Sequence, residues 1–267
     1  MEGFNHSQVP LSLREEFRWK RFGLGYNSPL NFLRSQWQSK PKSSFFLAYR
    51  CFLGAFFGIG VISYTVRYFQ KGTCFIYLTN WSFYMCGITS VYAAILQTVY
   101  HFQDSSWVPP TWVMQSYWAC FWITLCAAHV VSLTYWCLIY PSDRVPTSPT
   151  YVSDLYNIWT HAMPIILFTI DNLVVAHPSR LLHFIYPMGF CLVYLGFTIV
   201  FYVAGGRDLK GHTYIYSFLN YSKPAKTALI STVVMFVILA SSTLQYGVYR
   251  LRTLMAKMFG KLILDSS

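Results

Sequence analysis

The amino-acid sequence predicts an all-α integral membrane protein, a bundle of six transmembrane helices. Six long apolar stretches run through its 267 residues, and 55% of all residues are hydrophobic. Only 11% are charged, whereas a soluble domain carries about 25%. Because so little charge cannot cover a water-exposed surface, one compact domain of spanning helices is the simplest arrangement for this length.

Each predicted span holds the roughly 20 apolar residues that are needed to cross the core of a bilayer. Pro109, Pro110, Pro178 and Pro224 lie in the gaps between spans, as expected at helix boundaries. In chain order, the six predicted spans are 44–68, 75–102, 112–140, 154–177, 180–204 and 226–248.

Two basic tails flank the transmembrane domain, which we place at 44–248. Residues 249–267 form one tail and residues 1–43 the other, and the latter contains no apolar core typical of a signal peptide. We expect the first tail to lie along lipid headgroups rather than to be disordered. Its aromatic side chains would then dip into the interface: Phe17, Trp19, Phe22, Phe32 and Trp37.

The distribution of Lys and Arg predicts the orientation. With an even number of spans both tails lie on one side of the membrane, and their positive charge places that side in the cytoplasm. The loop 205–225, which carries Arg207, Lys210 and Lys223, is a mild exception. We expect a multi-pass protein of the plasma membrane, with the endoplasmic reticulum as the alternative.

The net charge of +11 does not predict nucleic-acid binding, because the basic residues lie in flanks and loops. There they set orientation and contact anionic lipids, so membrane lipids are the expected partners. The seven cysteines are an odd number without CxxC spacing, and no HExxH or HxxxH pattern occurs. We therefore expect neither a metal nor a cofactor.

Two features of the first span concern packing. Gly54 and Gly58 have the GxxxG spacing that lets helices approach closely in lipid. Arg50, near the start of the same span, is expected to extend to the cytoplasmic headgroups rather than to form a salt bridge.

The fourth span has a polar stripe on one face. At 100° per residue, Asn157, His161, Asp171 and Asn172 share a face, and apolar residues occupy the other. Because ionisable groups at membrane depth are costly, this stripe should face the bundle interior. We expect Asp171 to pair with His129, Arg180 or a tyrosine.

Thr79, Ser82, Cys86 and Ser90 form a similar face on the second span. Hydrogen bonding between helices is its ordinary use. However, spans two and four enter from the same side, with Thr79 roughly 6 Å and His161 roughly 10 Å into the membrane. A neutral imidazole can activate a hydroxyl, so Thr79 and His161 are candidate catalytic residues and Asn157 is the possible orienter.

Two further features remain open at this point. His129, in the middle of the third span, is interpreted as a partner in an interhelical hydrogen bond rather than as a metal ligand. The loop 205–225 either covers the mouth of the bundle as a lid or serves as a simple connector.

The chain resembles the rolling stone family of animal membrane proteins. The opening REEFRWKRFGLGYNSPLNFLRSQWQ and the stretch from Tyr151 through Pro224, with its YVAGGRD and YIYSFLNYSKP segments, carry the resemblance. It implies six spans and a part in myoblast fusion during muscle development.

A more distant similarity is to the androgen-induced family of intramembrane threonine hydrolases. Their nucleophile lies in a YLT motif, as in Tyr77-Leu78-Thr79, and their histidine precedes a proline, as His161 precedes Pro164. The segment NIWTHAMP departs from that family by holding one histidine. This similarity implies hydrolysis of fatty-acid ester lipids.

Two classes of function follow. The first is a membrane protein that participates in myoblast fusion, and the second is a Thr79/His161 lipid hydrolase with a fatty-acid ester substrate. A transporter is a weaker third possibility, since no repeat of broken helices supports it.

The predicted topology is tested by tags at the two ends of the chain. Both tags should be reached by antibody only after the plasma membrane is permeabilised, because both basic tails are expected in the cytoplasm. A C-terminal tag that is stained on intact cells would contradict the orientation or the number of spans.

Overall fold

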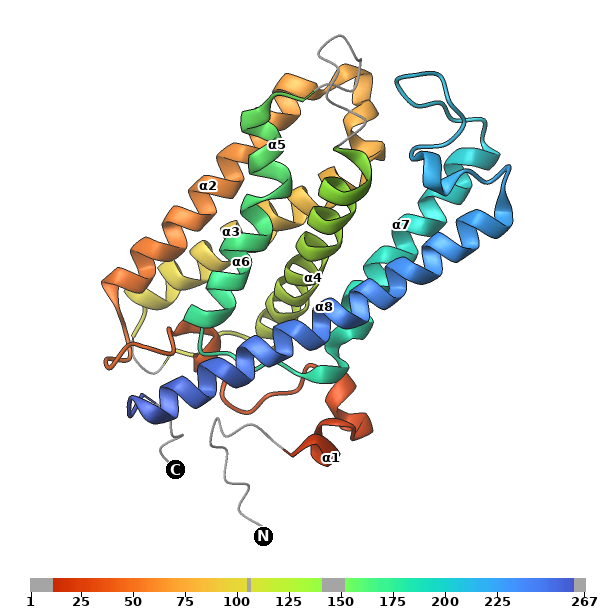
Figure 1. Ribbon diagram of the computed structural model, residues 1–267. Helices are drawn as coiled ribbons and strands as arrows, with labels where there is room; N and C mark the ends of the chain where they lie inside the picture. Colours follow the sequence, from red (N-terminus) through yellow and green to blue (C-terminus); the bar gives the residue numbers. More distant parts are fainter. Residues whose placement is uncertain (1–11, 105–106, 141–151, 262–267) are drawn as a thin grey trace.

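The computed structural model describes residues 12–104, 107–140 and 152–261, and its regular structure is helical (Figure 1). These residues contain no strand, only an isolated β-bridge between Ser35 and Val175. The predicted all-α class is confirmed for this part of the chain. The helices are α1 (Leu13–Glu16), α2 (Ser44–Tyr68), α3 (Leu78–Phe102), α4 (Thr111–Thr134), α5 (Asp154–His161), α6 (Met163–Val174), α7 (Ile185–Val203) and α8 (Pro224–Met258).

Five helical segments of the described residues are long and apolar enough to cross a membrane, which indicates a membrane protein. A π-helical turn, Tyr135–Ile139, extends α4, and a short 3-10 turn, Leu181–Phe184, precedes α7. α8 continues to Met258, although the sequence places the end of its span at residue 248. The five segments are Ser44–Tyr68, Leu78–Phe102, Thr111–Ile139, Leu181–Val203 and Pro224–Met258.

The fourth predicted span differs, because it consists of two shorter helices that meet at Ala162. Pro164 accounts for the break: it has no N–H to donate to the Thr160 carbonyl, and its ring crowds that carbonyl. One turn earlier, the Thr160 hydroxyl donates to the Tyr156 carbonyl at 2.7 Å. In Figure 1, α5 and α6 follow one another along the bundle beside α2 and α4.

Small residues let α2 and α3 pack closely, as the sequence predicts. A Cβ atom added at Gly54 would lie 2.9 Å from Ala94 Cβ, and one at Gly58 would lie 3.3 Å from Val91 Cγ2. Both distances are tighter than ordinary side-chain contacts, so larger residues here would push the two helices apart.

The polar stripe of the fourth predicted span faces the protein. Asp171 is 2% exposed and Asn172 is fully buried, whereas Ile170 on the opposite face is 44% exposed. This arrangement confirms the predicted sorting, with apolar residues outside and polar ones inside.

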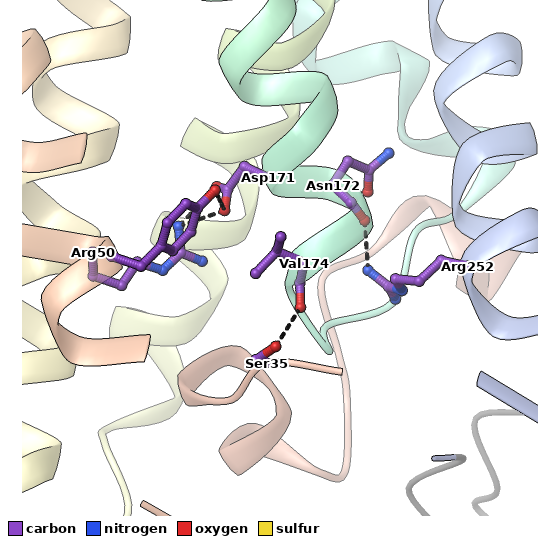
Figure 2. Close-up of polar contacts among 7 residues, drawn as sticks. Ser35, Arg50, Asp171, Asn172, Val174 and Arg252 are labelled. Atoms are coloured by element: carbon purple, nitrogen blue, oxygen red, sulfur yellow. Dashed lines mark hydrogen bonds and ion pairs between the residues drawn. The ribbon is translucent and has the colours of Figure 1, made fainter. Parts of the chain in front are cut away.

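Asp171 forms a buried ion pair with Arg50 (Figure 2). One guanidinium nitrogen, Nη1, lies 2.7 Å from Asp171 Oδ2 and 3.0 Å from Oδ1, and the Tyr49 hydroxyl donates to Oδ1 at 3.0 Å. The predicted tyrosine partner is confirmed. The expectation that Arg50 extends to the headgroups is wrong, because α6 brings a carboxylate to its depth and the pair neutralises both charges.

The other two expected partners of Asp171 lie elsewhere. Arg180 donates to the carbonyls of Gly23 and Gly25. His129 Nε2 lies 2.9 Å from Gln245 Nε2 on α8, and the interpretation of His129 as an interhelical partner is confirmed.

The C-terminal end of α6 is bound by two distant segments of the chain. Arg252 of α8 donates to the carbonyl of Asn172 at 2.9 Å (Figure 2). It also donates to the carbonyl of His177 at 2.8 Å. From the N-terminal segment, Ser35 Oγ and the Gln36 N–H donate to the Val174 carbonyl, and the Trp37 indole donates to that of Leu173. These donors satisfy carbonyls that a helix end leaves without partners.

Part of the N-terminal segment therefore belongs to the core. Phe32 is buried against Trp118, with the ring centres 5.3 Å apart, so it does not lie in the interface as expected from the sequence. Phe17 and Trp19 remain exposed.

Replacing Asp171 with leucine should destabilise the protein strongly, because Arg50 would remain buried without its counter-charge. Breaking a buried pair in this way costs about 3–5 kcal/mol. Thermal unfolding and folded yield in detergent measure the effect. Ile170→Leu, the neighbouring change on the outer face, is the matched control.

Replacing both members, as in Arg50→Leu with Asp171→Leu, should recover part of the loss, since no unpaired charge then remains. Unchanged stability of the Asp171→Leu variant would contradict the structural role of the pair.

Candidate functional site

A cavity of about 250 Å³ lies among α3, the end of α4, α5 and the loop that joins α7 to α8. Its walls combine polar and apolar groups from segments far apart in the sequence. Six of the lining residues matter for the chemistry: Thr79, Asn80, Tyr135, Asn157, His161 and Tyr216.

His161, the last residue of α5, is buried and held from three directions. Its Nδ1 lies 3.0 Å from the Asn157 carbonyl oxygen and 2.9 Å from Thr160 Oγ1, and its ring stacks on Tyr135 with the centroids 3.4 Å apart. A carbonyl can only accept, so Nδ1 carries the hydrogen and Nε2 keeps its lone pair. This tautomer leaves Nε2 able to accept a proton.

Asn157 contacts His161 through its main chain. Its side chain is used elsewhere: Oδ1 accepts from the Tyr135 hydroxyl at 2.9 Å, and Nδ2 donates to the Val152 carbonyl at 2.9 Å. Asn157 thus orients the imidazole directly through its carbonyl and indirectly through Tyr135, which stacks on the ring.

Thr79, the second residue of α3, lines the same cavity as His161, and α3 and α5 are in contact. Among the described residues, no hydrogen bond joins the Thr79 hydroxyl to the His161 imidazole. The prediction that the two side chains lie within hydrogen-bond reach or one water molecule apart therefore stays a prediction, although both residues line one cavity.

A second, apolar cavity of about 50 Å³ lies among α3, α4, α7 and α8. Val130, Leu195 and Met235 contribute to its walls. Thr79 and Tyr216 line both cavities, so the polar and the apolar space meet at the candidate nucleophile.

The loop between α7 and α8 covers the larger cavity as a lid. Asp208, His212 and Tyr214 line that cavity. Asp208 stabilises the turn by accepting the N–H of His212 at 2.7 Å, and its other oxygen lies 3.1 Å from His212 Nδ1. The sequence left two interpretations of this loop open, a lid and a simple connector. Its position at the wall of the cavity favours the lid.

Sequence reasoning missed the tyrosines of the site. Tyr135 and Tyr216 lie in aromatic-rich segments, where one more tyrosine carries no distinctive pattern. Their importance comes from contacts with Asn157, His161 and Leu78, which depend on the tertiary structure.

Within the described residues, no group of three or more His, Cys, Asp or Glu could hold a metal ion.

Known proteins resemble the chain over nearly its whole length. The family model described as Protein rolling stone matches residues 5–265. Protein rolling stone of Drosophila melanogaster is 31% identical over 259 residues, which cover 93% of this chain and 92% of that protein. No solved structure matches the chain. The matched region includes both cavities and the lid.

Proposed function

The chain belongs to the rolling stone family, and from this membership we propose that it participates in cell fusion, specifically myoblast fusion during muscle development. Family membership is the single observation that carries this proposal. The five long apolar helices support the membrane setting that such a role needs.

We also propose that α5 and α6 together make a sixth span. Residues 154–174 of α5 and α6 lie along the bundle beside long apolar helices, and the apolar face of α6 is exposed while its polar face is buried. Six spans with basic tails would place both termini in the cytoplasm, with the plasma membrane as the proposed location and the endoplasmic reticulum as the alternative.

A complementation experiment tests the fusion proposal. In myoblasts depleted of their own rolling stone protein, expression of this chain should restore the fraction of nuclei in multinucleate cells. The conservative Ile170→Leu variant should do the same, and Asp171→Leu should fail in proportion to its loss of folded protein. Wild-type protein that reaches the cell surface without restoring fusion would overturn the proposal.

An intramembrane hydrolase of fatty-acid ester lipids is the second candidate function. It is favoured by a specific observation: Thr79 and His161 line one cavity, and an apolar cavity suited to part of an acyl chain adjoins it at Thr79. The tautomer of His161 also leaves Nε2 free of hydrogen.

In this proposal Thr79 Oγ1 forms a bond to the acyl carbon while His161 Nε2 takes its proton. The carbonyl electron pair moves to oxygen and returns when the ester C–O bond breaks, and His161 gives its proton to the departing alkoxide. Water then attacks the acyl-threonine in the same way, which releases the fatty acid and restores Thr79.

Labelling with a fluorophosphonate tests this second candidate. The purified wild-type protein should react at Thr79. Thr79→Ala should abolish labelling, and His161→Ala should slow it by about 10²–10⁴-fold, the usual contribution of a general base. Thr98→Ala is the matched control, because Thr98 lies on α3 away from both Thr79 cavities. Equal labelling of wild type and Thr79→Ala would place any reactivity at another residue.

A further inference from the structure

We propose that Tyr216, carried by the lid, donates the hydrogen bond that stabilises the oxyanion formed at Thr79. The inference rests on the hydrolase proposed above as the second candidate. It assigns a role to a residue outside the pair that the sequence singles out, and it makes the lid part of the site.

The first observation is the position of the Tyr216 hydroxyl at the start of α3. Its oxygen accepts the N–H of Leu78 at 3.0 Å, and Leu78 directly precedes Thr79. The side chain of the N-cap residue Tyr77 does not cap α3, and the phenol of Tyr216 satisfies one of the N–H groups that a helix start leaves unpaired. The lid thereby reaches the backbone of the candidate nucleophile.

The second observation is that the ring of Tyr216 is held in place. It stacks on Phe218 with the ring centres 5.0 Å apart and meets Tyr77 edge-on at 6.0 Å. A donor that is already oriented stabilises developing charge without reorganisation, which is the basis of oxyanion stabilisation.

The third observation concerns the proton. Burial raises the pKa of Tyr216, against the opposing effect of the Thr79 hydroxyl and main-chain N–H beside it. The phenol therefore stays protonated at neutral pH and offers an O–H donor next to Thr79. In the tetrahedral intermediate the oxyanion is two bonds from Thr79 Oγ1, which places it near this donor.

Asn80, the next residue along α3, supports the view that the cavity is built for a ligand. It is 2% exposed and lines the cavity. Its Nδ2 donates to the Cys74 carbonyl, and its Oδ1 has no hydrogen-bond partner among the described residues. A buried acceptor without a partner is costly, and the hydroxyl of an alcohol product would satisfy it.

The experiment compares Tyr216→Phe with wild type in the reaction with a fluorophosphonate, over a range of probe concentrations. This substitution keeps the ring and removes the donor. Loss of one oxyanion donor lowers the maximal rate of phosphonylation by about 10²–10³-fold. The half-saturating probe concentration should stay at its wild-type value, and the melting temperature should fall only slightly, because the N–H of Leu78 loses its acceptor.

Tyr92→Phe is the matched control. The Tyr92 hydroxyl donates to the Val113 carbonyl at 3.0 Å, and Tyr92 lies on α3 but lines neither cavity. Its loss should leave the maximal rate unchanged.

The outcomes separate this inference from the hydrolase proposal. A wild-type protein that does not react at Thr79 overturns both. A reactive wild type with an equally fast Tyr216→Phe variant overturns only the role of Tyr216. A variant that loses probe binding and thermal stability together with rate shows that Tyr216 merely holds the lid, which also overturns the inference.

Discussion

The end of α6 is the constraint on which the rest of this bundle depends. A carboxylate at this depth must be neutralised, and the last carbonyls of a buried helix must find donors. Arg50 of α2 supplies the counter-charge, and Arg252 of α8 together with residues 35–37 supplies the donors. Segments from both ends of the chain are thus joined at one point in the interior, and none of them can move alone without leaving a buried polar group unpaired.

This constraint also sets the direction in which α5 presents its side chains. Asp171 and His161 belong to one polar stripe, so holding Asp171 against Arg50 turns the same side of the broken helix inward. The break at Ala162 makes His161 the last residue of α5. The negative end of a helix dipole favours an imidazolium, so the position suits a base that gains a proton. Thr79, in the first turn of α3, lies at the positive end of its own helix, where developing negative charge is stabilised.

The lid between α7 and α8 links the start of α3 to the wall of the polar cavity. Tyr216 accepts a hydrogen bond from α3, and the turn around Asp208 and His212 lines the same cavity. Opening the lid would expose the polar cavity and free the first N–H of α3 at the same time. Lipid remodelling at such a site is compatible with a part in fusion, because both processes act on the lipid of one membrane.

Composition and period alone predicted the helical class, six apolar spans, five of which are long apolar helical segments in the structure, and the inward-facing stripe with Asp171. These properties follow from local rules: apolar length, helical spacing and the cost of charge in lipid. The partner of Asp171 was not predictable in the same way, because Arg50 lies 121 positions away and its depth suits headgroups equally well. The division of the fourth segment, the burial of Phe32 and the contact of Tyr216 with α3 were likewise decided by tertiary structure. A long side chain has many possible partners along a sequence, and only packing in three dimensions selects the one that satisfies its charge and its hydrogen bonds.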